Sequence, residues 1–162
     1  MIDVALWVSV QRLLGREARA LDACDWDNWL DLYAPDAEFW VPAWDDEGRP
    51  TSDPHTDISL IYYRNRGGLE DRVFRIRTGK SAASQPTRTC HLVQLLEITR
   101  NTETVRAKTS WNVLSYRTEQ VRQLFGWAEY ELAPSSDSWV IQRKKTVVLN
   151  DRIDVAVDVY DI

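Results

Sequence analysis

A succession of four long strand patterns in the second half of the chain places the tightest limit on its fold. Each pattern alternates apolar and polar side chains and is rich in β-branched and aromatic residues. Short turns, Thr-Arg-Asn-Thr and Pro-Ser-Ser-Asp, connect the first strand to the second and the third to the fourth. Long consecutive strands with short turns indicate an antiparallel meander. The predicted strands are Thr89–Thr99, Thr104–Tyr116, Gln123–Leu132 and Trp139–Leu149.

The first half of the chain shows helical periodicity instead. An amphipathic helix is predicted from Asp3 to Asp22, and a second helix at Trp26–Tyr33, which Pro35 would close. A strand at Glu38–Val41 follows. Helices followed by a meander indicate the α+β class, and 162 residues suit one domain spanning residues 1–162. We expect the N-terminal helices to pack inside a strongly curled antiparallel sheet, forming a cone with an apolar interior.

The central segment Ile58–Thr78 is predicted to contain a strand, a turn and a helix. The strand is Ile58–Tyr63, the turn Arg64–Gly68 contains paired glycines, and the helix is Leu69–Thr78. A loop of small residues is predicted to follow at Gly79–Pro86. Five arginines in this segment oppose only two acidic residues. The arginines could bind an anionic ligand, but subunit contacts or salt bridges are the favoured interpretation.

Charge and composition exclude several classes of protein. Residues 22–57 hold eleven acidic side chains against one basic side chain, whereas the whole chain has a net charge of −5. An acidic and a basic face would suit head-to-tail association, although both faces could simply be solvated. Binding to nucleic acid is not expected, because the only basic cluster is short. No signal peptide or membrane span is predicted, and two cysteines, Cys24 and Cys90, are expected as buried free thiols in the cytoplasm.

The chain contains few residues that could carry chemistry. His55 and His91 lack metal-binding spacing, and there is no HExxH, glycine-rich phosphate loop or GxSxG motif. One enzymatic hypothesis remains, a cofactor-independent dehydratase or isomerase whose acid/base site would lie in the cone. Its candidate residues are Asp31, Tyr33, Asp36 and His91. The favoured alternative is that both aspartates are surface or capping residues and that His91 is a hydrogen-bonded strand histidine.

Several motifs give the chain a resemblance to a known family. The run ISLIYYRNRGGLEDRVFRIRTGKSAAS, followed by RT-x-H at Arg88–His91, resembles the small (β) subunit of aromatic-ring-hydroxylating dioxygenases. The resemblance is strongest to the benzoate and anthranilate branch, with a slight preference for anthranilate. Further matching motifs are REARALD, W-D-x-W-L, YAPDAEFWVPAWDD and LNDRIDVAVDVYDI.

The resemblance implies a fold, partners and a role. Such subunits have a cystatin-like or nuclear-transport-factor-2-like (NTF2-like) cone and assemble with a large α subunit, typically as α3β3. The α subunit carries a Rieske [2Fe–2S] cluster and a mononuclear non-haem iron, and a separate reductase supplies electrons from NADH. Two Cys and two His could not ligate both iron centres, so this chain would hold no cofactor and no catalytic residue.

The resemblance therefore implies a non-catalytic structural subunit in the catabolism of aromatic compounds. A free-standing dehydratase or isomerase using Asp31, Tyr33 and His91 is the alternative. Charge and size suggest residues of the subunit interfaces, each of which could equally have a role within the chain. These candidates are Trp40, Trp44, Tyr62, Arg64, Arg66, Glu70, Asp71, Arg72 and Arg75.

Overall fold

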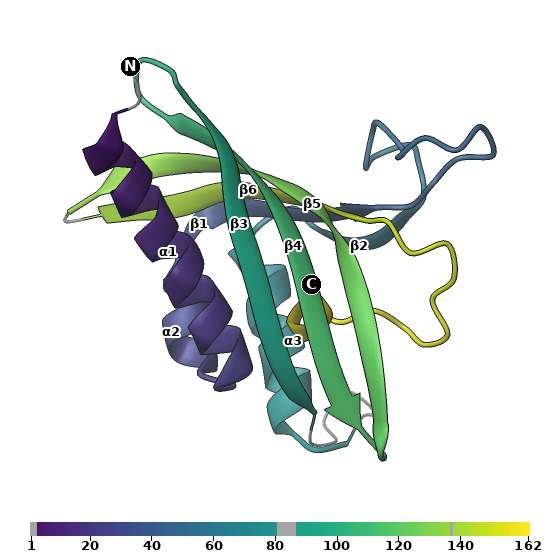
Figure 1. The fold of residues 1–162 in the computed structure, drawn as a ribbon. Coiled ribbons are helices and arrows are strands. Elements are labelled where there is room, and N and C mark those ends of the chain that lie inside the picture. Colours follow the sequence, from purple (N-terminus) through teal and green to yellow (C-terminus); the bar gives the residue numbers. More distant parts are fainter. Residues whose placement is uncertain (1–2, 81–86, 137) are drawn as a thin grey trace.

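Three helices lie on one face of a bent six-stranded sheet (Figure 1). The computed structural model describes residues 3–80, 87–136 and 138–162. The helices are α1 (Val4–Asp22), α2 (Trp26–Leu30) and α3 (Arg66–Arg77), and a short 3-10 turn, η2, spans Val159–Asp161. The strands are β1 (Tyr33–Pro42), β2 (Ser59–Tyr63), β3 (Arg88–Arg100), β4 (Val105–Arg117), β5 (Gln120–Ser135) and β6 (Ser138–Val148).

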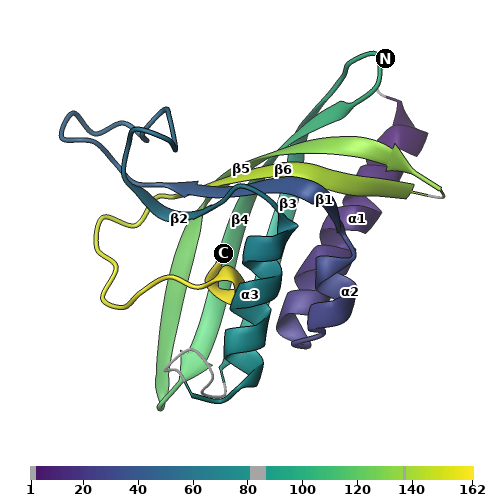
Figure 2. The same ribbon diagram turned by 180° about the vertical axis from the view of Figure 1, so that it is seen from behind.

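The sheet has the strand order β2-β1-β6-β5-β4-β3. Strands β3 to β6 form the predicted antiparallel meander, whereas β1 pairs with β6 in parallel. The expectation of a purely antiparallel sheet was therefore wrong at this pair, whose strands lie far apart in the sequence. The sheet bends around the helices but stays open, with β2 and β3 as its edges (Figures 1 and 2). The predicted α+β class is confirmed, while the strong curl was overestimated.

The first helix forms as its sequence predicts. Asp3 caps it by accepting a hydrogen bond from the Leu6 amide at 3.0 Å. The predicted apolar stripe faces the sheet, and Val10, Leu14 and Leu21 are fully buried. The predicted alternation of buried and exposed residues also holds along β4, where one side of the strand is buried: Val105, Ala107, Thr109, Trp111 and Val113.

The second predicted helix is too long, because a strand replaces its last turn. The helix ends at Leu30, and the Leu32 carbonyl accepts a hydrogen bond from the Ile141 amide of β6 at 2.8 Å. Pro35 lies inside β1, where the β1–β6 register is irregular between Tyr33 and Glu38. Since proline has no amide hydrogen, such an irregular stretch of ladder can accommodate it.

The turn expected at Arg64–Gly68 also needs correction. Helix α3 already begins at Arg66, capped by the Asn65 side chain, which accepts a hydrogen bond from the Gly67 amide at 3.0 Å. Neither Gly67 nor Gly68 has a positive φ. A Cβ atom on Gly68 would lie 2.4 Å from the Tyr63 ring, so close packing rather than backbone freedom requires glycine there.

Two smaller expectations concern the loops and cysteines. Both Cys24 and Cys90 are free but exposed, so the prediction of buried thiols was wrong. Most of the loop predicted at Gly79–Pro86 lies outside the described residues. The segment between β1 and β2 projects away from the helices (Figure 1). In the described part of the chain no helix is long and apolar enough to cross a membrane.

Candidate functional site

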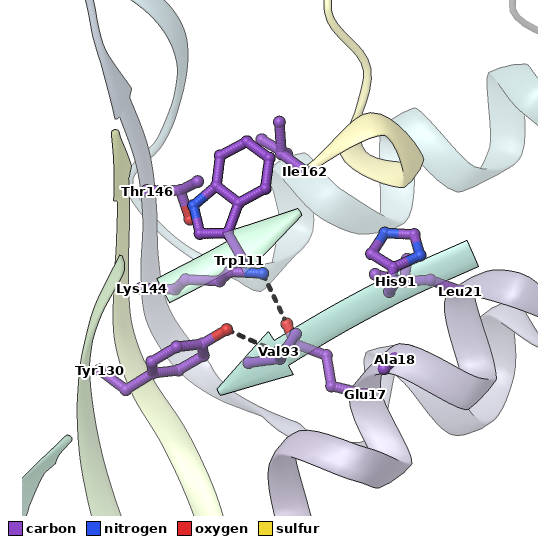
Figure 3. A pocket seen from close by; sticks show the side chains of 10 residues that line it. All are labelled: Glu17, Ala18, Leu21, His91, Val93, Trp111, Tyr130, Lys144, Thr146 and Ile162. Atoms are coloured by element: carbon purple, nitrogen blue, oxygen red, sulfur yellow. Dashed lines mark hydrogen bonds and ion pairs between the residues drawn. The ribbon is translucent and has the colours of Figure 1, made fainter. Parts of the chain in front are cut away.

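The inner face of the sheet carries a buried polar cluster centred on Glu17. Glu17 lies in the buried stripe of α1 and is only 3% exposed. Its carboxylate accepts a hydrogen bond from the Lys144 ammonium of β6 at 3.0 Å and one from the Tyr130 hydroxyl of β5 at 2.9 Å. The Tyr33 hydroxyl of β1 donates a further, short hydrogen bond to it. Three strands thus converge on one helical carboxylate (Figure 3 shows the contacts of Lys144 and Tyr130).

The charges in this cluster stabilise one another. Burial alone would raise the pKa of Glu17, but the Lys144 charge and the hydrogen bonds lower it below its ordinary value. Burial, together with the Glu17 charge, raises the pKa of Tyr33 and of Tyr130 well above the ordinary tyrosine value. The cluster is therefore an ion pair held by two neutral phenols, and its carboxylate accepts three hydrogen bonds.

A second polar link joins α1 to the edge strand β3. The His91 Nδ1 atom lies 2.6 Å from the Asp22 carboxylate, and the His91 amide donates to the same carboxylate at 3.1 Å. The Thr89 hydroxyl donates to it at 2.8 Å. Burial lowers the pKa of His91, although the Asp22 carboxylate opposes that shift, which favours the neutral ring at pH 7. Because a carboxylate only accepts hydrogen bonds, the neutral ring carries its proton on Nδ1.

Both polar groups border a small hollow between α1 and the sheet (Figure 3). Its lining includes Glu17, His91, Trp111, Lys144, Thr146 and Ile162. The hollow has room for about one water molecule. An aromatic ring would therefore not fit in this hollow without displacing core side chains.

The residues of the hypothetical acid/base site are not brought together as that hypothesis requires. Asp31 and Asp36 are both exposed, as the alternative interpretation expected. Tyr33 and His91 are buried but are already bonded to Glu17 and Asp22. Sequence reasoning missed Glu17 and Lys144, although a charged residue inside an apolar helical stripe was a signal for a buried partner.

The described residues contain no group of three or more His, Cys, Asp or Glu side chains that could hold a metal ion. Both cysteines are exposed, His91 is bonded to Asp22, and the His55 ring packs edge-on against Tyr62. A Rieske cluster needs two Cys and two His converging on one point, and a non-haem iron needs two His and a carboxylate. The side chains in the described ranges do not fit either centre.

Several of the predicted interface residues are engaged within the chain. Trp40 is only 1% exposed, and its indole donates a hydrogen bond to the Ser59 hydroxyl at 2.9 Å. The cations of Lys145 and Arg143 both lie over its ring. Trp44 is 42% exposed, although its indole donates to the Val148 carbonyl at 2.8 Å.

Among the candidates on β2, on α3 and between them, some are bonded within the chain and others are exposed. Arg72 makes two hydrogen bonds to Asp158 and so holds the segment before η2 against α3. Arg66 contacts Glu70 at 2.9 Å and the Tyr33 carbonyl at 3.1 Å. Tyr62 donates a hydrogen bond to Glu38 at 3.3 Å. Exposed side chains are those of Arg64, Glu70, Asp71 and Arg75.

The outer face of the sheet has a charged half and an apolar half. In the charged half Glu97, Lys108, Glu129 and Lys145 follow one another across four strands. The apolar half, called here the outer patch, lies toward the β4–β5 turn, where Leu92 and Phe125 both pair with Asn112. Between 37% and 68% of each of its side chains is exposed. The outer patch consists of Leu92, Leu114, Tyr116, Val121 and Phe125.

Comparison with known proteins gives a consistent result. Residues 16–155 match the family described as "Ring hydroxylating beta subunit". The β subunit of toluate 1,2-dioxygenase from Pseudomonas putida is 45% identical over 156 residues, covering 95% of this chain and 96% of the relative. The small subunit of anthranilate 1,2-dioxygenase from Acinetobacter baylyi is 40% identical over 163 residues, covering 99% of this chain and all of the relative.

Solved structures agree. The crystal structure of the β subunit of benzoate 1,2-dioxygenase from Burkholderia mallei superimposes with a TM-score of 0.78 at 42% identity, covering 100% of this chain and 99% of that one. An NTF2-like protein with a cystatin-like fold from Novosphingobium aromaticivorans has a TM-score of 0.66 at 12% identity, over 92% of this chain and 85% of its own. The second match concerns the fold alone and confirms the NTF2-like architecture.

Proposed function

The chain belongs to the family of ring-hydroxylating β subunits, and we propose that it is the structural subunit of a dioxygenase acting on an aromatic carboxylic acid. Near-complete matches to toluate, benzoate and anthranilate dioxygenase subunits at 40–45% identity carry this proposal. The identities are too similar to support the slight preference for anthranilate drawn from the sequence. This chain supports the assembly of the complex, and a partner chain carries out the oxidation.

The interior of the cone supports a non-catalytic role. Glu17, Tyr33 and His91 are hydrogen-bonded to neighbours, and the hollow beside them is water-sized. The iron centres therefore belong on a large α subunit, with electrons reaching them from NADH through a reductase. The assembly is α3β3 and cytoplasmic, and residues 1–162 form one domain within it.

The chain would act by fixing the distance between large subunits. Electron transfer between iron centres on different chains requires a constant spacing, which a rigid scaffold provides. The exposed members of the predicted interface set, together with the outer patch, are the side chains available for such contacts. Arg66 and Arg72 serve first to hold this chain together.

Co-purification tests the proposal directly. The chain expressed alone should be colourless and free of iron, whereas co-expression with the large subunit should yield a red-brown complex that oxidises the aromatic acid. Stoichiometric iron in the lone chain, or turnover of an aromatic acid or a dehydratable alcohol by it, would contradict the proposal.

The interface is best tested at Arg64. The Arg72→Glu substitution would place a second acid against Asp158 and loosen the chain itself, so it does not isolate an interface effect. Arg64 is exposed, and Arg64→Glu should leave the unfolding midpoint unchanged while reducing the fraction of hexamer seen by native mass spectrometry. Arg12→Glu, on the exposed side of α1, is the matched control. Equal hexamer fractions in both variants would remove Arg64 from the interface.

A further inference from the structure

Residues 150–162 form a strap that is fixed to the domain at its two ends. At one end the Asn150 side chain accepts a hydrogen bond from the Phe125 amide and donates one to the Gln123 carbonyl, both at 3.0 Å. The other end, residues 158–162, is called here the plug, and at most 8% of any of its residues is exposed. Figure 2 shows the strap looping away from the sheet before the plug returns beside α3.

The middle of the strap is held only weakly. Among the described residues, 151–157 make no hydrogen bond or ion pair to another element, and Arg152 pairs with Asp154 of the strap itself. Val155 is 51% exposed, while Ile153 and Val157 are partly buried against the core. Segments with few buried contacts open at a lower free energy than a packed core does.

The plug carries its own backbone hydrogen bonds. The Asp158 side chain accepts one from the Val159 amide at 2.8 Å, and the Asp161 side chain accepts one from the Asp158 amide at 2.9 Å. The Asp161 amide donates to the Asp158 carbonyl at 2.9 Å. These three bonds lie inside the plug, so none of them has to break when the plug leaves the domain.

Two arginines clamp the plug from different elements. Arg72 of α3 makes two hydrogen bonds to Asp158, and Arg122 of β5 pairs with Asp161 at 3.0 Å. Both aspartates are buried, whereas both arginine side chains are partly exposed. Each guanidinium therefore compensates for a carboxylate that would otherwise be buried alone.

The plug also borders two separate spaces. Ile162 lines the hollow between α1 and the sheet. Tyr160 lines a groove of about 670 Å³, whose walls also include Val155 of the strap and Val121 of β5. Removal of the plug would join this groove to the hollow, because neighbouring residues of the plug form part of the wall of each.

We propose that the strap is a hinged closure of the cone. It swings about Asn150, and the plug undocks as one unit while the helices and the sheet stay folded. The two arginine clamps hold it shut. In the closed state the Glu17–Lys144 pair and His91 are shielded from bulk water, and in the open state the hollow beside them becomes continuous with the groove.

Amide hydrogen exchange of the full chain tests whether the plug opens independently of the domain. Exchange in residues 158–162 should be faster than in β4 and should depend only weakly on urea, since local opening exposes little surface. Equal exchange rates and equal urea dependence in the two regions would show that the plug leaves only when the domain unfolds. This comparison uses the unmodified chain, so it decides the proposal whether or not a variant folds.

The substitution Val105→Thr sharpens the comparison. It places a hydroxyl in the core at the first residue of β4, whereas the groove lies at the other end of that strand, beside Ser115. The variant should speed exchange in β4 but not in residues 158–162, because it destabilises the closed and open states equally. Faster exchange in both regions by the same factor would contradict independent opening.

The clamp itself is tested at Arg122. Arg122→Gln leaves the buried Asp161 carboxylate without its cation, so exchange in residues 158–162 should rise about tenfold or more. Arg106→Gln is the matched control, since it breaks an exposed pair with Glu131 and should change that exchange by no more than about fivefold. Changes of equal size in the two variants would show that the clamp does not hold the closure shut.

Discussion

The two faces of the sheet differ in how far their charged and apolar side chains are buried. On the inner face the charged groups Glu17 and Lys144 are nearly fully buried, and each is hydrogen-bonded. On the outer face charged residues alternate in sign across the strands, and apolar side chains of the outer patch remain exposed. The inner face is thus explained by the folding of this chain, whereas the side chains of the outer patch are only partly covered by it.

This difference indicates that the outer face, rather than the inner face, is available for contacts with other subunits. A buried ion pair depends on both partners, because removing one leaves an uncompensated charge away from water. Exposed ion pairs contribute little to stability, and exposed apolar side chains contribute almost nothing. Substitutions on the inner face should therefore affect folding, and substitutions on the outer face should affect association.

The largest effect is expected at the buried pair. Glu17→Gln removes the negative charge that faces Lys144 and should reduce the free energy of unfolding by about 3–5 kcal/mol. The matched control is Glu131→Gln on the outer side, where Glu131 pairs with Arg106 and the loss should be at most about 1 kcal/mol. Urea denaturation of both variants measures the difference. Losses of equal size would show that the two faces do not differ as described.

A smaller effect should appear in the pH dependence of stability. Burial lowers the pKa of His91 below the ordinary 6.5, so the unfolded chain takes up a proton at a higher pH than the folded chain. Stability should therefore fall as the pH drops below about 6.5, with a slope from this one proton of at most about 1.4 kcal/mol per pH unit.

The variant His91→Gln should remove this slope, and exposed His55→Gln should retain it. The groups around the His91 ring are Asp22, Lys144 and Glu17; the pKa of Glu17 is lowered, so its carboxylate titrates further down the pH scale. Denaturation curves recorded between pH 5 and 7 separate the histidines. The assignment to His91 fails if both variants keep the slope of the unmodified chain.

The smallest effect on folding is expected in the outer patch. Leu114→Thr should reduce the free energy of unfolding by about 1 kcal/mol or less, because 37% of the side chain is already exposed. The adjacent Val113→Thr places a hydroxyl on the buried face and should cost about 1–3 kcal/mol.

The two positions should rank in the opposite order when assembly with the large subunit is measured instead of folding stability. Leu114→Thr combined with Phe125→Thr should lower the yield of complex with the large subunit, whereas Val113→Thr, once folded, should not. Co-purification yields normalised to folded chain measure this. A double variant that assembles as well as the unmodified chain would exclude the outer patch from the interfaces.

Much of the local structure could be predicted because periodicity reports which side of an element is buried. The stripe of α1 and the alternation along β4 are both observed. The predictions failed where a long-range contact overrides local preference. The Leu32 carbonyl joins β6 instead of extending α2, and the Tyr63 ring explains Gly68 better than any turn does.

The candidate site was less predictable than the fold. Asp31 and Asp36 remained surface residues, and the two charges that organise the interior, Glu17 and Lys144, were not among the candidates. They lie 127 positions apart, and nothing in their local patterns identifies one as the partner of the other. The same holds for Arg72 and Asp158, which lie 86 positions apart and are hydrogen-bonded to each other.

The amino-acid sequence by itself determined the order of helices and meander strands and the membership in the family, because both depend on patterns that run along the chain. Only the tertiary structure decided the parallel pairing of β1 with β6, the partner of each buried charge, and the water-sized hollow between α1 and the sheet. The physical reason is that periodicity specifies how much of a side chain is buried, whereas its partner is chosen by the packing of distant segments.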